Sequence, residues 1–254
     1  MCGIAGFIDF NKKSGKEILV KMTDALLHRG PDDAGYDLLD HPAAHIGLGQ
    51  RRLSILDLSP LGHQPMHFEH LVINFNGEVY NFKEIKKELE EKGYSFLSGS
   101  DTEVILKGYH CWGPGIIEKL TGMFAIVIYD KAKNEVVFIR DRAGVKPLYY
   151  YQTDKLLLFS SELKSFSIHP DFEKKINRSS LALYLQFSYI PAPYTIYQNT
   201  HKLLPGHFMK LDLTHGEVSI HKYWDVYDFY NKETLRISNQ EAIEETDRLL
   251  NKAY

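Results

Sequence analysis

The sequence predicts a layered α+β fold, in which blocks of antiparallel strands and blocks of helices are separate along the chain. Strand-like segments follow one another between residues 123 and 160, with hairpin-sized connections such as 130–134. Helical patterns gather elsewhere, at 82–92 and 100–111. The 254 residues, of which 44% are hydrophobic, are enough for one large domain or for one domain with an appendage.

The first elements are a strand and a helix. Residues 3–10 are apolar and flanked by glycine, which predicts a short buried strand. Residues 18–28 carry a helical stripe of apolar side chains, which Arg29-Gly30-Pro31 ends. We expect the next strands at 52–58 and 71–76, separated by a loop that contains glycine and proline.

Two helices should follow these strands. Residues 82–92 are charged with one apolar face, and Gly93 ends the pattern. A second helix is expected at 100–111, with Ser100 as its N-cap and Glu103 at the capping-box position.

The remaining elements change character after about residue 165. Before it, antiparallel strands are expected at 123–129, 135–140, 148–152 and 156–160. After it, the pattern predicts a helix at 179–187, a strand pair at 208–213 and 218–222, and a helix at 240–253. That last pattern has no stop signal before Tyr254, so we expect the natural chain to continue.

Composition narrows the class of protein. The net charge of −3 gives no reason to expect nucleic acid as a partner, and no apolar run is long enough to span a bilayer. The start does not read as a signal peptide, and the two cysteines are too few for a disulfide framework. The histidines show no paired ligand spacing. We therefore expect a cytoplasmic protein without a metal site in this segment.

Cys2 is the most informative residue. If Met1 is removed, Cys2 carries both a thiol and a free α-amine, which titrates at about 7.7–8.0. Such an amine can accept the thiol proton, which makes the residue a nucleophile with its own base. The alternative is that Cys2 is a small apolar residue at the start of a buried strand.

Further groups could complete an amide-hydrolysing site. One of the adjacent Arg51 and Arg52 could hold a carboxylate in a two-bond fork, or both could be structural. The Asn76-Gly77 pair could supply two donors to an oxyanion, or a tight turn. Glu78 and Asp101 could accept from a substrate ammonium, or be a loop carboxylate and a helix-start residue. Taken together, the groups suit glutamine or asparagine as substrate.

Several motifs carry a resemblance to a known family. They are Cys2-Gly3-Ile4, His28-Arg29-Gly30-Pro31-Asp32, Arg52-Leu53-Ser54-Ile55, Asn76-Gly77-Glu78-Val79-Tyr80-Asn81, Gly99-Ser100-Asp101 and Arg140-Asp141-Arg142-Ala143-Gly144-Val145-Lys146-Pro147-Leu148-Tyr149. In this order they resemble the N-terminal glutaminase domain of glutamine-dependent asparagine synthetases, which are class II glutamine amidotransferases. The resemblance implies the N-terminal-nucleophile hydrolase fold, a four-layer αββα sandwich of two antiparallel sheets.

The same resemblance implies roles for individual residues. Catalytic roles fall to a nucleophile and two oxyanion donors, namely Cys2, Asn76 and Gly77. Contacts to glutamine fall to Arg52, Leu53, Ile55, Asn76, Gly77, Glu78 and Asp101. Arg52 is chosen over Arg51 because it directly precedes Leu53-Ser54-Ile55. Gln50 stands where many members carry histidine, at a position that is not a glutamine contact.

The resemblance also predicts the organisation of the chain. Residues 1–210 should form the glutaminase domain, and residues 211–254 a linker with the start of a truncated synthetase domain. The Ser-Gly-Gly-x-Asp-Ser pyrophosphate loop of such synthetases is absent from this sequence. ATP and Mg are therefore expected only in the missing domain, which would receive ammonia from this one, and no cofactor is expected here. A homodimer is one assembly that the resemblance allows.

Two alternatives remain open at this point. The acceptor of the ammonia could be a sugar or peptide carboxylate instead of aspartate. If Met1 is retained, the chain could be a glutamine-binding module without turnover, because a blocked amine removes the base.

Overall fold

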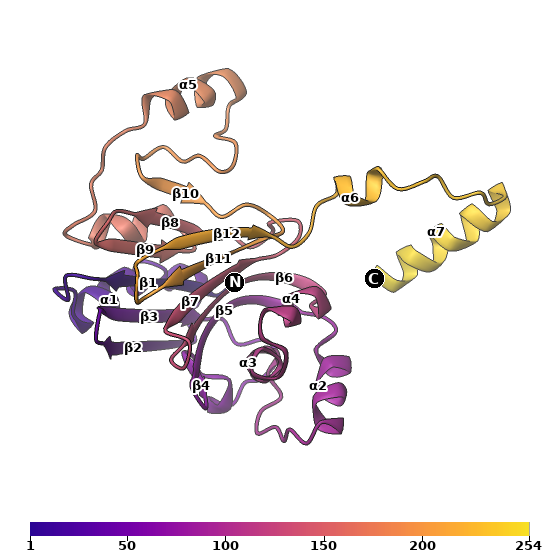
Figure 1. Ribbon diagram of the computed structural model, residues 1–254, viewed down its shortest axis with the longest axis horizontal. Coiled ribbons are helices and arrows are strands. Elements are labelled where there is room, and N and C mark those ends of the chain that lie inside the picture. The colour runs from indigo at the N-terminus through magenta and orange to yellow at the C-terminus, as the bar shows by residue number, and fades with distance from the viewer. Residues whose placement is uncertain (254) are drawn as a thin grey trace. The chain divides into compact units, whose positions relative to one another are not determined.

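In the computed structural model, which describes residues 1–253, two six-stranded antiparallel sheets form the centre of the unit Met1–Tyr223 (Figure 1). Sheet A contains β1 (Gly3–Asp9), β2 (Asp33–His41), β3 (Ala44–Arg52), β8 (Tyr149–Gln152), β9 (Leu156–Ser160) and β10 (Thr200–Lys202), in the spatial order β10-β8-β9-β1-β3-β2. Sheet B contains β4 (Met66–Phe68), β5 (Leu71–Val79), β6 (Gly122–Asp130), β7 (Glu135–Arg140), β11 (His207–Asp212) and β12 (Val218–Lys222), in the spatial order β12-β11-β7-β6-β5-β4.

Helices cover the outer faces of both sheets. Sheet A is covered by α1 (Lys16–Asp24) and the 3₁₀ helix η4 (Leu163–Ile168), and η1 (Leu27–Arg29) follows α1. Sheet B is covered by α2 (Phe82–Glu91), α3 (Asp101–Trp112) and α4 (Ile116–Lys119), with η3 (Gly113–Gly115) between the last two. The loops add η2 (Pro60–Gly62) and α5 (Arg178–Phe187). The layers are therefore αββα, as expected from the resemblance.

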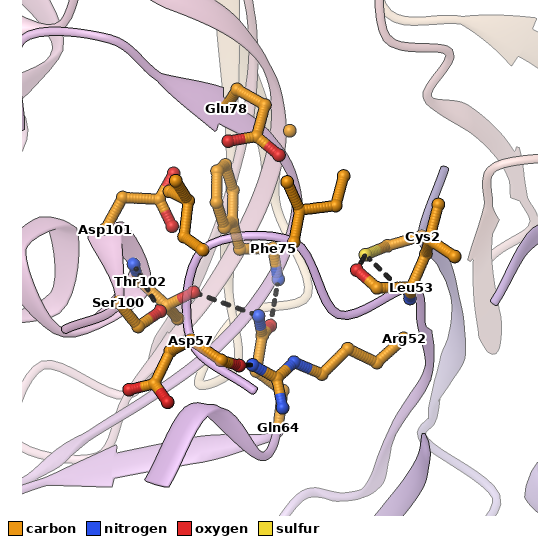
Figure 2. A pocket seen from close by; sticks show the side chains of 13 residues that line it. Cys2, Arg52, Leu53, Asp57, Gln64, Phe75, Glu78, Ser100, Asp101 and Thr102 are labelled. Carbon is orange, nitrogen blue, oxygen red and sulfur yellow. Dashed lines mark hydrogen bonds between the residues drawn. The ribbon is translucent and has the colours of Figure 1, made fainter. Parts of the chain in front are cut away.

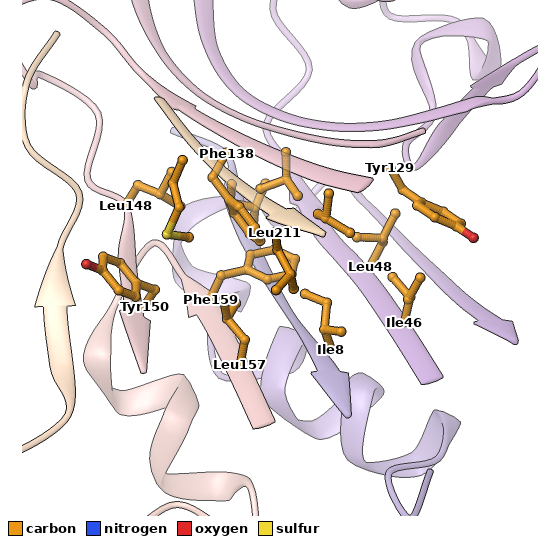
Figure 3. Packing of buried hydrophobic residues seen from close by; sticks show 14 of the residues in the cluster. Ile8, Ile46, Leu48, Tyr129, Phe138, Leu148, Tyr150, Leu157, Phe159 and Leu211 are labelled. Carbon is orange, nitrogen blue, oxygen red and sulfur yellow. The ribbon is translucent and has the colours of Figure 1, made fainter. Parts of the chain in front are cut away.

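Strand pleating sorts the apolar side chains between these layers, because successive residues of a strand point to opposite faces. On β1, Ile4 and Ile8 face sheet B, whereas Ala5 and Phe7 pack against α1. The space between the sheets is filled by a hydrophobic cluster, in which Phe138 of sheet B meets Phe159 of sheet A (Figure 3). This central layer sets the distance between the two sheets.

The expected strand at 52–58 is wrong. The strand in this region is β3, which ends at Arg52; it pairs along its whole length with β2 on one side and over residues 45–51 with β1 on the other. Glycine and polar residues in β3 hide its strand character, because glycine is depleted in strands. Gly49 is required here, because a Cβ would lie 2.0 Å from the Thr23 hydroxyl of α1.

The start of α3 confirms one prediction and corrects another. Ser100 is the N-cap, and its Oγ accepts from the Thr102 N–H at 3.1 Å. Glu103 does not close a capping box. Its carboxylate accepts from the N–H groups of Leu97 and Ser98 and pairs with Lys107 at 2.6 Å. Glu103 therefore fixes the loop that precedes the helix.

The first unit extends beyond the boundary that the sequence suggests. Residue 210 lies inside β11, which pairs with β7 and β12, so the unit continues to Tyr223. The second unit begins at Trp224 and contains α6 (Tyr227–Tyr230) and α7 (Asn239–Ala253). The expected open helix end at Tyr254 lies outside the described residues. Within residues 1–253, no helix has the length and apolar character needed to cross a membrane.

Candidate active site

The space between the sheets becomes polar at one end. Asn74 of β5 reaches across it and donates to the Gly49 carbonyl at 3.1 Å. Gln50 of β3 reaches in the opposite direction and donates to the Phe75 carbonyl at 2.8 Å. These buried amides join the two sheets where the apolar layer ends. The candidate site lies beyond them.

A small, partly open cavity lies at this end of the sandwich (Figure 2). Seven of the eight residues predicted to act in the site line it, namely Cys2, Arg52, Leu53, Ile55, Gly77, Glu78 and Asp101. The sequence assigns no role in the site to the other lining residues, namely Leu56, Asp57, Gln64, Phe75, Ser100 and Thr102. Ser100 and Thr102 flank Asp101, which was a usable signal, but nothing local marks Gln64.

Cys2 directly precedes β1 and shares the alternation of Ile4 and Ile8, so its side chain faces sheet B. Its Sγ lies 3.4 Å from the Leu53 nitrogen and 3.7 Å from the Leu53 oxygen. Its carbonyl accepts from Arg29 Nε at 2.9 Å. The thiol therefore lies against the residue after β3, while Arg29, in the turn that follows α1, holds the Cys2 backbone.

Burial raises the pKa of the Cys2 thiol, although the Leu53 N–H and the positive charges of the chain's α-amine and Arg52 act in the opposite direction. A thiol with a raised pKa carries little thiolate at neutral pH. Attack by this sulfur therefore needs a base that accepts its proton during the reaction.

The two neighbouring arginines have different environments. The Arg52 guanidinium donates to the carbonyls of Asp57 and Ser59 and lines the cavity. Gly62 makes room for it, since a Cβ there would lie 2.0 Å from Arg52 Nη2. Arg51 pairs instead with Asp24 at 2.6 Å. The structure thus brings Arg52 to the cavity and gives Arg51 a structural ion pair.

Gly77 presents its backbone to the cavity because of its place on β5. The Phe75 N–H donates to Gln64 and the Val79 N–H to Asp101, so both point away from β6. Backbone groups two residues apart on an antiparallel strand point to the same side. The Gly77 N–H, between them, therefore points toward the cavity. The Asn76-Gly77 pair forms no tight turn, because both residues continue β5 opposite β6.

Two carboxylates lie near one another on the cavity wall. Burial, and to a smaller extent the charge of Glu78, together raise the pKa of Asp101 to about 7, against the hydrogen bond from Val79. Burial also raises the pKa of Glu78, which the charge of Lys146 lowers. A cationic group bound between the two carboxylates would stabilise their ionised forms.

Asn76 is the one predicted residue that does not line the cavity. It shares the inner face of β5 with Asn74, is 1% exposed, and points toward sheet A. Neither Nδ2 nor Oδ1 of Asn76 has a hydrogen-bond partner among residues 1–253. Buried polar groups are nearly always paired, so an unpaired amide beside a cavity calls for a functional explanation.

The fold is that of the N-terminal-nucleophile hydrolases. Glutamine phosphoribosylpyrophosphate amidotransferase from B. subtilis superposes with a TM-score of 0.66, at 19% identity, over 88% of this chain and 49% of that one. A model of the glutamine amidotransferase domain family matches residues 1–224, and the chain belongs to that family.

Curated relatives of the chain include proteins named asparagine synthetases. Asparagine synthetase [glutamine-hydrolyzing] 2 of Bacillus subtilis is 37% identical over 93% of this chain and 32% of its own length. A homologue from Methanocaldococcus jannaschii is 40% identical over 98% of this chain and 51% of its own length. The chain thus spans between about a third and a half of the relatives' length.

Proposed function

We propose that this chain is the glutaminase part of an ATP-dependent asparagine synthetase and that it hydrolyses glutamine to glutamate and ammonia. One observation carries the proposal. A partly buried thiol, an arginine, a strand-edge N–H and two carboxylates meet at one cavity, and they come from four separate segments of the chain. The family membership and the names of the relatives agree with this assignment.

In the proposed reaction, removal of Met1 frees the α-amine of Cys2. The amine accepts the thiol proton while Sγ attacks the side-chain carbonyl carbon of glutamine. The Gly77 N–H and the unpaired Asn76 amide donate to the developing oxyanion. Collapse of the adduct expels ammonia, which takes up that proton. Water then hydrolyses the γ-glutamyl thioester, which releases glutamate and restores the thiol.

The cavity walls suit the other end of glutamine. The Arg52 guanidinium binds the α-carboxylate, and Glu78 and Asp101 bind the α-ammonium. Leu53 and Ile55, which lie beside Arg52 on the same wall, contact the substrate chain. Binding the ammonium between two carboxylates of raised pKa offsets the free-energy cost of ionising them.

The remainder of the proposal concerns the full-length protein. The ammonia passes to a synthetase domain, which uses ATP and Mg to adenylate aspartate, whereas hydrolysis in this domain needs no cofactor. Because the chain spans half or less of its relatives, the acceptor is assigned from their names alone. We place the protein in the cytoplasm, with a homodimer as its proposed assembly.

The test compares the purified wild-type chain with its Cys2→Ala variant. Intact-protein mass spectrometry first establishes that Met1 has been removed. The wild type should then release glutamate and ammonia from glutamine in equal amounts, and the variant should bind glutamine without turnover. Undiminished hydrolysis by Cys2→Ala would overturn the nucleophile assignment. A wild type that lacks Met1, binds glutamine and does not hydrolyse it would make the chain a binding module.

A further inference from the structure

Gln64 is a buried cavity residue that the proposed reaction does not use. It is 4% exposed, and its side chain lies between β5 and the start of α3 (Figure 2). Its Oε1 accepts from the Phe75 N–H at 2.7 Å, and its Nε2 donates to Thr102 Oγ1 at 3.0 Å. A backbone N–H can only donate, so the hydrogen bond to Phe75 fixes the orientation of the amide.

The Gln64 side chain takes the place of a neighbouring strand at one residue of β5. On β4, Met66 pairs with Ile73, and β5 continues past this point without a strand on that side among the described residues. Two residues earlier in the same register, Gln64 stands opposite Phe75 and supplies a side-chain oxygen in place of a backbone one. An edge N–H that would otherwise be buried and unpaired is thereby satisfied.

Gln64 also belongs to a bracket around Gly77, which comprises Gln64, Asp101 and Thr102. At one side of Gly77, the Phe75 N–H is held by Gln64. At the other side, the Val79 N–H is held by Asp101 at 3.0 Å. Thr102, next to Asp101 on α3, accepts the second hydrogen bond of Gln64 and closes the bracket.

The bracket is anchored to both sheets. The Gln64 carbonyl packs so closely on Gly35 of β2 that a Cβ there would lie 1.8 Å from it. The backbone of Gln64 is therefore fixed against sheet A, while its side chain fixes β5 of sheet B. Cys2 directly precedes β1 of sheet A and Gly77 belongs to β5 of sheet B, so Gln64 contacts both of the sheets that carry these two residues.

We propose that Gln64 is a positioning residue, which through Phe75 and Thr102 aims the Gly77 N–H at the oxyanion formed on the substrate of Cys2. The proposal rests on the proposed glutaminase function. It requires no contact between Gln64 and glutamine. A displaced oxyanion donor stabilises the transition state less well, while it affects binding of the substrate little. Loss of Gln64 should therefore lower kcat more than it raises KM.

The test uses Gln64→Leu, Thr102→Val and Thr102→Ser in the chain without Met1. The first two each break the bracket at a different atom, and the serine variant keeps the accepting hydroxyl. Gln64→Leu and Thr102→Val should each lower kcat for glutamine about tenfold or more, with KM changed less than about threefold. Thr102→Ser should recover most of the wild-type kcat. Gln198→Leu, at an exposed glutamine, controls for the substitution itself.

A second readout separates positioning from damage to the fold. Iodoacetamide alkylates a thiolate by displacing iodide and forms no oxyanion, so its reaction does not use the Gly77 N–H. Alkylation of Cys2, followed by peptide mass spectrometry, should keep its wild-type rate and pH profile in Gln64→Leu and Thr102→Val.

Three results would overturn the proposal while leaving the glutaminase function intact. They are an unchanged kcat, a rise in KM alone, and a loss of alkylation in parallel with the loss of turnover. A wild-type chain that alkylates at Cys2 and hydrolyses no glutamine would instead remove the proposed function, and the role of Gln64 with it.

Discussion

The Asp101 carboxylate accepts a hydrogen bond from the Val79 N–H at 3.0 Å, which joins the first turn of α3 to the end of β5. This bond favours the ionised carboxylate, yet burial outweighs it and leaves the pKa of Asp101 at about 7. The residue thus stabilises the strand at the site while carrying a charge that the fold alone disfavours.

Asp101→Asn should stabilise the folded chain and weaken its binding of glutamine. Between pH 4 and 7 the folded state holds a proton that the unfolded state has released, so rising pH destabilises the wild type in this window. Asparagine still accepts the hydrogen bond from Val79 and never ionises. The free energy of unfolding of the variant should therefore exceed that of the wild type by up to about 4 kcal/mol, and this difference should be fully present above pH 7. Urea unfolding at pH 5 and 8 measures this difference in stability. KM for glutamine should rise in the variant, because one of the two carboxylates that bind the α-ammonium is lost. A variant less stable than wild type at pH 8 would contradict the assigned pKa shift.

Arg52→Lys should raise KM for glutamine about tenfold or more, with a smaller effect on stability. Lysine cannot reproduce the two-bond fork of a guanidinium on a carboxylate. Arg51→Lys is the matched control, because Arg51 pairs with Asp24 instead of lining the cavity. Steady-state kinetics on both variants provide the measurement. Equal KM values would show that Arg52 does not bind the α-carboxylate of glutamine.

Gly77→Ala should lower both stability and turnover. A Cβ at this position would lie 2.2 Å from the Met123 carbonyl and 2.7 Å from the Phe124 Cα, so β5 must shift away from β6. Overpacking of this kind costs about 1–3 kcal/mol. Gly115→Ala is the control, since a Cβ there would meet no atom within 4 Å outside its own local backbone. Denaturant unfolding with glutaminase assays tests this, and a fully active alanine variant at Gly77 would refute the close approach.

Lys146→Met should shift the pH dependence of glutamine binding. Lys146 is 4% exposed, and its charge lowers the pKa of Glu78 against the effect of burial. Without that charge the pKa of Glu78 rises, so KM should begin to increase at a higher pH as the solution is acidified. Lys155→Met, at an exposed lysine, should leave the profile unchanged. An identical acid limb in wild type and Lys146→Met would show that Glu78 does not govern binding.

Phe138→Ala should destabilise the chain by about 3–5 kcal/mol, as expected for a large buried aromatic residue. The Phe138 and Phe159 rings are fully buried, with centroids 5.5 Å apart at 67°. Thermal or denaturant unfolding provides the measurement, with the half-exposed Phe187 of α5 as the alanine control. A loss no larger than that of the control would mean that the two sheets do not depend on this contact.

The sequence predicts the elements whose local signals agree with their tertiary role. The Ser100 cap, the helix at 82–92 and the strands from 123 to 160 all follow from patterns that packing reinforces. It fails at β3, because Gly49 serves a contact with α1 rather than strand propensity. It fails also at Glu103, whose carboxylate stabilises the preceding loop.

The candidate site shows the same limit. Short motifs brought Cys2, Arg52 and Asp101 to attention because each carries a reactive or charged group. Gln64 escaped notice because its importance comes from register: it stands opposite Phe75 only once β4 and β5 have paired. A role that arises from the pairing of strands leaves no trace in the local composition around the residue.

Cys2 directly precedes β1 of sheet A and Arg52 ends β3 of the same sheet, whereas Gly77 and Glu78 belong to β5 of sheet B, and the apolar layer beside the site holds the two sheets apart. The thickness of that layer therefore sets the distance between the Cys2 thiol and the Gly77 N–H. Substitutions in this layer, such as Leu48→Ala or Val127→Ala, should change the distance between the two sheets as well as lower the stability of the fold. The volumes of core side chains should therefore affect hydrolysis as well as stability.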